Sequence, residues 1–146
     1  MIRRAVHDDY EAMIPLGRAM VIEGWPHAPI DEDKVRQVFD AIVSNGYACV
    51  SVTDGEIDGL LLGMIDQLWF SQALCAHDYA FYVSPAARGG MAAPRLVADF
   101  VKWGRAHAVA EIQISVSSGV QVEASRRLLE GFGFEFSGGI FKLKVA

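Results

Sequence analysis

The sequence predicts an α/β (α+β) fold in which a mixed, mostly antiparallel sheet of about seven strands is flanked by four helices. Segments with a hydrophobic period of two alternate with segments whose period is that of a helix, in the order β-α-α-β-β-β-α-β-α-β-β. Two helices precede the first long pair of strands, and residues 81–94 run from a strand through a small-residue loop into a helix. This order places helices on both faces of one sheet.

Length and composition narrow the class of protein. A chain of 146 residues is expected to form a single domain over residues 1–146, and a hydrophobic content of 52% excludes a disordered chain. The longest apolar stretch, residues 60–65, is too short to span a bilayer. The net charge of −5 argues against a nucleic-acid partner and is compatible with a small cationic one.

The N-terminal segment and the two cysteines allow predictions of the compartment and of the metal content. No apolar export segment follows Arg3 and Arg4, so we expect a cytoplasmic protein with no membrane partner. Cys49 and Cys75 lie within predicted strands and lack the spacing of metal ligands or of a disulfide framework. We therefore expect reduced core cysteines and no metal.

The first elements are a strand over residues 2–6 and two helices. Asp8 and Glu11 form a capping-box pattern that begins the first helix, and Pro15 inside it predicts a kink or a new segment. Residues 23–29 read as a rigid loop, and Asp31 is expected to cap the second helix.

The period then changes to two. Residues 47–53 and 57–70 are predicted strands joined by a hairpin turn at Asp54-Gly55. Gly59 and Gly63 within the second strand indicate a bulge or close packing. The fourth strand begins at residue 75 or 77 and ends at Val83.

The C-terminal third alternates helices and strands. Leu96, Phe100, Trp103 and His107 lie at offsets of four, seven and eleven, which predicts one buried face of a helix over residues 91–107. A fifth strand over residues 112–116 and a helix over residues 123–130 follow. Residues 134–136 and 140–145 are predicted as two final strands around Gly138-Gly139.

The loop after the fourth strand has the properties of an anion site. The first amides of a helix have no internal partner, and the helix dipole adds partial positive charge there. Small residues at Gly89, Gly90, Ala92 and Ala93 would let a phosphate approach these amides, and Arg88 adds a cation. The loop lacks the patterns of ATP and NAD sites, so the prediction is a cradle for another pyrophosphate, with an ordinary turn as the alternative.

These residues carry a resemblance to a known family. Pro85, Arg88 and Ala93 match the proline and the Arg/Gln-x-x-Gly-x-Gly/Ala loop of the GNAT superfamily of N-acyltransferases, and Gly133-Phe134 matches the end of its fourth helix. The resemblance covers nearly the whole chain. It implies a GNAT-like sheet that splays apart between its fourth and fifth strands.

The chain departs from the family pattern at three positions. Met91 replaces the first glycine of the loop motif, and Val122 stands where an asparagine is frequent. The tyrosine that often serves as the general acid falls on Leu129, which cannot donate a proton.

What the resemblance implies is an N-acetyltransferase that moves an acetyl group from acetyl-CoA to a primary amine by direct attack. The pyrophosphate of the co-substrate would lie on the loop, and its pantetheine arm along the fourth strand. The implied cofactor-binding residues are Phe81, Tyr82, Val83, Arg88, Gly89, Gly90, Met91, Ala92 and Ala93.

The chemistry has several candidates. Asp78 is the first candidate for the general base and His77 the second, and strand alternation lets only one of them face the site. Glu23 and Trp25, on a loop that forms one wall of the acceptor site in the resembled fold, would hold a cationic amine. Ser117 and Ser118 are further donors or turn residues.

Two other functions stay open. The first is a GNAT-fold protein that binds an acyl-CoA without turnover, which Met91, Val122 and Leu129 favour. The second is an interaction module that keeps only the fold. A free edge strand would also permit a homodimer.

Overall fold

Over residues 1–116 and 119–145, which the computed structural model describes, the chain forms a five-stranded sheet in the order β1-β2-β3-β4-β5. Adjacent strands are antiparallel except β4 and β5, which are parallel. The elements are β1 (Ile2–Arg4), the 3-10 turn η1 (His7–Asp9), α1 (Tyr10–Gly24), α2 (Glu32–Asn45), β2 (Tyr47–Thr53), β3 (Glu56–Gln67), β4 (Leu74–Val83), the 3-10 turn η2 (Pro85–Ala87), α3 (Ala92–Ala106), β5 (Glu111–Gln113) and α4 (Val122–Gly131).

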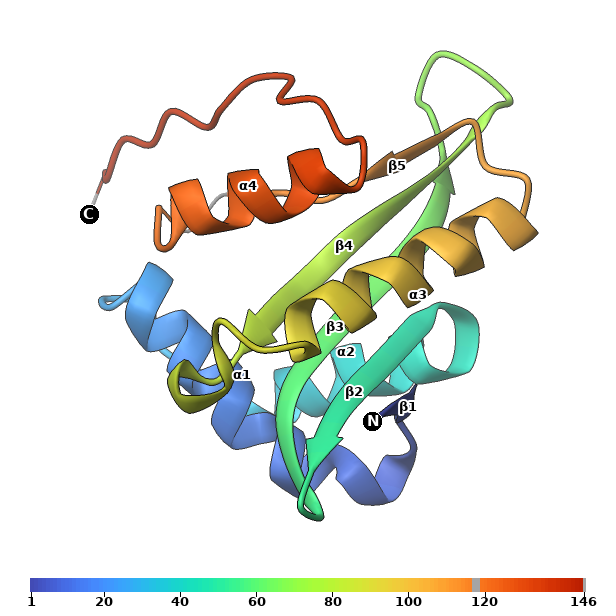
Figure 1. The fold of residues 1–146 in the computed structure, drawn as a ribbon. Helices are drawn as coiled ribbons and strands as arrows, with labels where there is room; N and C mark the ends of the chain where they lie inside the picture. Colours follow the sequence, from blue (N-terminus) through green and yellow to red (C-terminus); the bar gives the residue numbers. More distant parts are fainter. Residues whose placement is uncertain (117–118, 146) are drawn as a thin grey trace.

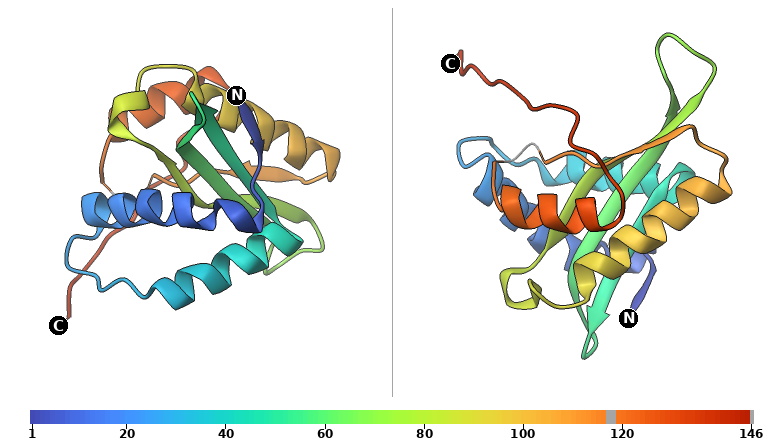
Figure 2. Two further views of the ribbon diagram at one scale, coloured as in Figure 1. Left: turned by 90° about the horizontal axis from the view of Figure 1, so that it is seen from below. Right: turned by 45° about the horizontal axis from the view of Figure 1, so that its top comes forward.

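The helices form two layers around the sheet. Helices α1 and α2 cover one face, and α3 and α4 cover the other (Figures 1 and 2). The predicted mixed sheet with helices on both faces is therefore confirmed. Each face has its own hydrophobic cluster, so every central strand is buried on both sides.

The start of the first helix differs from the prediction. Asp9, not Asp8, caps the entry, because its carboxylate accepts the N–H of Val6 at 2.8 Å. The same carboxylate receives two hydrogen bonds from Arg3, at 2.7 and 2.8 Å, which tie β1 to the helix entry. Asp9 caps the entry because Arg3 binds its carboxylate. The Asp8–Glu11 sequence pattern does not show that Arg3 lies beside Asp9.

Other local predictions hold. Asp31 caps α2 by accepting the N–H of Lys34 at 3.2 Å. Asp54 and Gly55 have φ angles of 52° and 80°, the left-handed pair that a two-residue hairpin turn requires. Of the two outcomes expected at Pro15, a kink or a new segment, the new segment is wrong because α1 continues through this residue, and the kink stays a prediction.

A bulge in β4 changes which side chains face which layer. Leu62 of β3 pairs with Ala80, but the next residue, Gly63, pairs with Asp78, so Tyr79 has no partner on β3. As a result Ala80 packs in the cluster under α1 and α2, while Ala76 packs in the cluster under α3. Without the bulge, both alanines would point to the same face.

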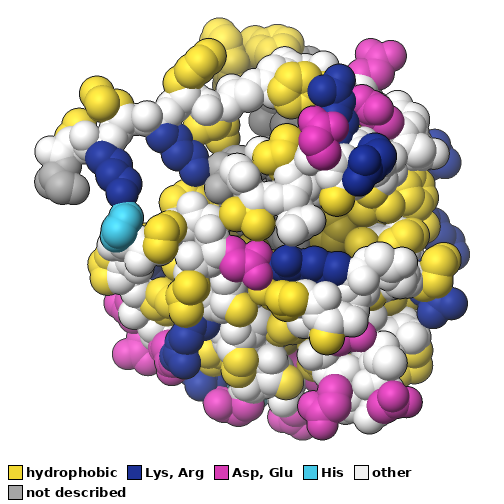
Figure 3. All heavy atoms as spheres, turned by 60° about the vertical axis from the view of Figure 1, so that its left-hand side comes forward, with side chains coloured by type: hydrophobic (Ala, Val, Ile, Leu, Met, Phe, Trp, Pro, Cys, Tyr) yellow, Lys and Arg dark blue, Asp and Glu magenta, His cyan; other side chains and the backbone are white. Residues whose placement is uncertain are grey.

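The predicted last two strands do not form. Residues 134–136 and 140–145 have no strand pairing and make up a C-terminal tail (residues 134–145) that stands away from the body (Figure 3). The side chains of Phe141 and Leu143 are fully and 86% exposed. Strand β5 is only three residues long and offers too little edge for another strand. An alternating hydrophobic pattern in the sequence is therefore not enough to form a strand here.

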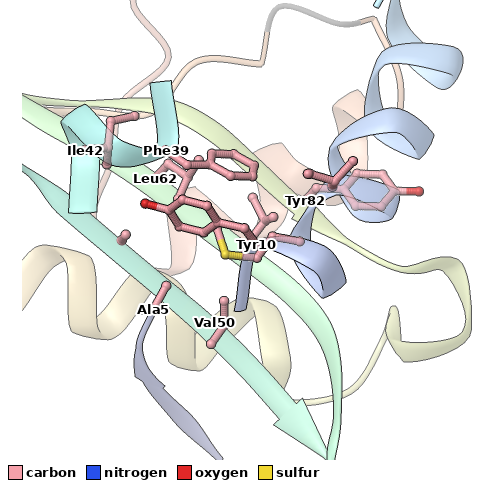
Figure 4. Packing of buried hydrophobic residues seen from close by; sticks show 11 residues of the cluster. Ala5, Tyr10, Phe39, Ile42, Val50, Leu62 and Tyr82 are labelled. Carbon is pink, nitrogen blue, oxygen red and sulfur yellow. The ribbon is translucent and has the colours of Figure 1, made fainter. Parts of the chain in front are cut away.

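Packing of α1 on the sheet positions one wall of the functional site. Met13 and Tyr10 of α1 are buried against Leu62 of β3 and Tyr82 of β4 in the cluster shown in Figure 4. The Tyr10 hydroxyl donates to Asp40 at 2.8 Å, and burial together with this bond raises the pKa of Tyr10 to about 12. These contacts fix the N-terminal half of α1, and at its C-terminal end Glu23 accepts the Tyr82 hydroxyl of β4 at 2.9 Å.

Gly63 is expected to be required for close packing of α3 on β3. A Cβ at this position would lie 2.6 Å from the ring of Phe100 and 2.9 Å from the His77 carbonyl. Gly63→Ala should lower the free energy of unfolding by about 1–3 kcal/mol, measured by urea denaturation. Gly17→Ala, in a helix with nothing within 4 Å of the new atom, should instead raise it by about 0.5–1 kcal/mol. Equal effects of the two changes would contradict this assignment.

Candidate active site

The site begins where β4 and β5 separate. The last paired residues are His77 and Gln113. One residue further on, the carboxylate of Asp78 accepts the backbone N–H of Ser115 at 2.8 Å, so a side chain replaces the main-chain ladder. Beyond this point the strands diverge and a cavity of about 370 Å³ opens between them.

Five parts of the chain line this cavity. Residues 78–83 of β4 form one wall and residues 114–116 form the opposite one. Helix α4 covers the cavity with four residues, and the end of α1 and the loop into α3 complete its rim. Helix α4 contributes Ala124, Ser125, Leu128 and Leu129. The end of α1 contributes Met20, Glu23 and Trp25. The loop and the start of α3 contribute Arg88, Gly89, Gly90, Ala93 and Pro94.

The loop presents unpaired amides to this rim. The first hydrogen bond of α3 runs from the N–H of Arg95 to the Met91 carbonyl at 3.1 Å. The amides of Ala92 and Ala93 therefore precede the helical ladder, and Pro94 has none to satisfy. Gly89 has a φ of 85°, a conformation that a residue with a side chain rarely adopts.

The other loop amides are used to build the turn. Those of Ala87 and Arg88 donate to the carbonyls of Ser84 and Pro85 at 2.9 and 3.3 Å, and that of Gly90 donates to Ala87 at 3.4 Å. Within the part of the chain that the structure describes, this leaves the amides of residues 89 and 91–93 as the donors available to a ligand.

The side chain of Arg88 is held away from these amides. It donates to both carboxylate oxygens of Glu23 at 3.0 and 2.9 Å and to the carbonyl of Val83 at 3.0 Å. In this conformation Arg88 pairs with Glu23, and its role as a cation for pyrophosphate stays a prediction. Glu23, the carboxylate that competes with a phosphate for Arg88, is 65 residues away in sequence. Local sequence patterns therefore do not reveal that it lies beside the loop.

Glu23 is a fixed carboxylate. The Tyr82 hydroxyl donates to it at 2.9 Å, in addition to the two bonds from Arg88. Burial would raise the pKa of Glu23, but the hydrogen bonds from Arg88 and Tyr82 outweigh burial and lower it. Glu23 is thus charged at neutral pH and unsuited to accept a proton.

Asp78 and His77 face different surroundings. Asp78 lines the cavity, and burial raises its pKa although the Ser115 N–H opposes the shift. His77 contacts Asp66 of β3, with 2.6 Å between Nε2 and Oδ2, and it does not line the cavity. Of the two candidate bases, only Asp78 is placed at the site.

Helix α4 presents an apolar surface at the position of the family tyrosine. Leu129 is buried and lines the cavity, whereas Val122 is 41% exposed and does not. Two phenols that the sequence did not assign to catalysis, those of Tyr79 and Tyr82, belong to the cavity wall. The register shift that leaves Tyr79 without a partner on β3 falls at Gly63, where the sequence indicated a bulge or close packing.

Several other features lie elsewhere. Ser117 and Ser118 lie outside the described residues. Across residues 1–116 and 119–145, no three side chains of His, Cys, Asp or Glu gather closely enough to hold a metal ion. Among the same residues no helix is both long and apolar enough to cross a membrane.

Comparison with known proteins identifies the family. The family model for the acetyltransferase (GNAT) family matches residues 4–134. The chain belongs to this family. The resemblance seen in the sequence is thereby confirmed, and with it the class of enzyme, an acetyl-CoA-dependent N-acetyltransferase.

Solved structures support the fold of this GNAT chain. A transcriptional regulator from Bacillus halodurans C-125 is 20% identical, with 99% of each chain covered and a TM-score of 0.79. A ribosomal-protein-alanine N-acetyltransferase from Brucella melitensis is 22% identical over 94% of this chain and 86% of that one, with a TM-score of 0.77.

A third similar structure contains a ligand. AAC(6')-Iy in complex with the bisubstrate analogue CoA-S-monomethyl-acetylneamine is 20% identical, covers 100% of this chain and 98% of its own, and has a TM-score of 0.74. No curated protein matches the chain significantly.

The raised pKa of Asp78 has a measurable effect on stability. A carboxyl whose pKa is higher in the folded state loses stability as the pH rises from the unfolded pKa of about 4 through the folded one. Asp78→Asn keeps an oxygen for the Ser115 N–H and removes this charge. The melting temperature of the variant relative to wild type should therefore be higher at pH 7 than at pH 4. A difference that does not change with pH would contradict the buried, charged Asp78.

Proposed function

We propose that the protein transfers the acetyl group of acetyl-CoA to a primary amine of a small molecule or peptide by direct attack. The observation that carries this proposal is the set of amides at residues 89 and 91–93, which lie beside a cavity between two separating strands. Such amides at a helix start bind phosphate. The strands provide the room for an extended arm.

The cavity fits the rest of the co-substrate. From residue 78 on, the edge of β4 that faces away from β3 has no neighbouring strand. Pantetheine contains two amide groups, so it can hydrogen-bond to the main chain of residues 81–83 as a strand would. The similar structure that carries a CoA bisubstrate analogue is consistent with this placement.

The acceptor would enter on the side of α1. Glu23 and Trp25 lie at the rim of the cavity, on the face that α1 and α2 cover. Because Arg88 pairs with Glu23, the carboxylate contributes little net charge, and the ring of Trp25 is the better contact for an ammonium group. Among similar structures, one carries an acetylneamine group and another acts on ribosomal-protein alanine, so relatives differ in their acceptors.

Asp78 would act as the general base. It takes the proton of the acceptor ammonium, directly or through water, because burial raises its proton affinity. The amine nitrogen then forms a bond to the thioester carbon and the carbon–sulfur bond breaks. The second proton of the nitrogen passes to solvent, and CoA leaves as a thiolate that takes up a proton from solvent. No covalent bond to the enzyme forms.

One observation favours the alternative of acyl-CoA binding without turnover. Leu129 occupies the cavity wall where the family often has an acidic tyrosine. Release of free thiol with a panel of amines distinguishes the two functions. CoA binding without any thiol release would support the alternative.

Binding of CoA should depend on Gly89. Gly89→Ala introduces a side chain at a φ of 85° beside the unpaired amides and should weaken CoA binding at least tenfold by calorimetry, about 1.4 kcal/mol. Gly133→Ala imposes the same strain, at a φ of 90°, outside the cavity and should leave the affinity unchanged. For wild type, CoA at one hundred times its Kd should add about 2.7 kcal/mol of stability. Equal affinities of the two variants would contradict the cradle.

Activity should depend on Asp78 and not on His77. Asp78→Asn should lower kcat by about 10²–10⁴-fold and remove the acidic limb of the pH–rate profile, because the limb reports protonation of the base. His77→Gln, a change outside the cavity, should leave the profile in place. The assignment is overturned if the limb persists in Asp78→Asn.

A further inference from the structure

The C-terminal tail makes two side-chain contacts with elements that border the active-site cavity. At its start, the guanidinium of Arg126 on α4 lies 5.6 Å from the ring centroid of Phe136. Further along, Nζ of Lys142 lies 4.9 Å from the ring centroid of Trp25 at the end of α1. Trp25 lines the cavity, and Arg126 follows Ser125 of its α4 wall, so the tail contacts two elements that border the cavity.

The apolar and the basic side chains of the tail point in different directions. Figure 3 shows apolar side chains pointing outward and basic ones pointing back toward the body. Residues 134–145 have no strand pairing that would fix their position.

Lys142 differs from the other lysines of the chain. The sequence has four, Lys34, Lys102, Lys142 and Lys144. Lys34 begins α2 and Lys102 lies on α3, and neither lines the cavity. Among the lysines of the described residues, only Lys142 makes a cation–π contact with a cavity residue, Trp25. Lys144 shares its tail and its exposure and provides a matched internal control.

We propose that Lys142 is a site of self-acetylation. The inference rests on the proposed function, since it needs acetyl-CoA bound in the cavity beside Trp25. The ring that would hold an external ammonium holds the side chain of Lys142 instead, at a high local concentration. The cavity also contains the carboxylate of Asp78, which can accept a proton from the incoming ammonium.

The step balances without a further reactant. The Lys142 ammonium loses one proton, and its nitrogen forms a bond to the carbonyl carbon of the thioester. The carbon–sulfur bond breaks, the nitrogen gives up a second proton that neutralises the CoA thiolate through solvent, and acetyl-lysine remains. Because acetylation removes the charge, the contact with Trp25 is lost and the ring becomes available to external amines.

The test is a time course of the full chain with acetyl-CoA, followed by peptide mass spectrometry. Lys142 should gain one acetyl group on the order of tenfold or more faster than Lys144, with a rate per molecule that does not change with protein concentration. Trp25→Leu should reduce the rate at Lys142 to that at Lys144. Lys142→Arg, which keeps the charge, should remove the modification without raising it elsewhere.

Each outcome bears on the proposal. Equal acetylation of the four lysines would mean chemical reaction in solution and would overturn it, as would a rate that rises with protein concentration. No acetylation in a sample that CoA stabilises against heat would overturn self-acetylation alone. No acetylation together with no CoA-induced stabilisation would overturn both this inference and the proposed function.

Discussion

The hydrogen bond from the Ser115 amide to the Asp78 carboxylate is the contact on which the site depends. It lies where the β4–β5 ladder stops, and it satisfies a main-chain donor that loses its strand partner. Ser115 is exposed, so its amide could also bond to water, but the carboxylate ties residue 115 to β4 just where the main-chain ladder ends. The cavity begins immediately beyond this tie.

The bulge at Tyr79 makes this arrangement compatible with the core. It turns Asp78 toward the α3 and α4 side while Ala80 and Tyr82 pack under α1 and α2. Tyr82 then reaches Glu23, and Glu23 holds Arg88. The end of α1, the last residues of β4 and the loop into α3 are thus linked by one short chain of hydrogen bonds.

Local signals in the sequence predicted most of the fold. The cap at Asp31, the hairpin turn at Asp54-Gly55 and the loop at residues 88–93 each depend on near neighbours, and each forms. The pairing of Arg88 with Glu23 and the bulge at Tyr79 depend on residues far apart in sequence. Strands predicted at residues 134–136 and 140–145 failed for the same reason, because a strand needs a partner edge.

These long-range contacts also determine the electrostatics of the site. If Arg88 were free, the loop would attract anions by charge; since it is paired with Glu23, the attraction comes from main-chain amides and the helix dipole. On the acceptor side the same pairing cancels the charge of Glu23, which leaves Asp78 as the unpaired carboxylate among the described residues of the cavity wall. Under the proposed function, this ion pair leaves the rim nearly neutral, and Asp78 is the carboxylate that an ammonium group would meet beyond Trp25.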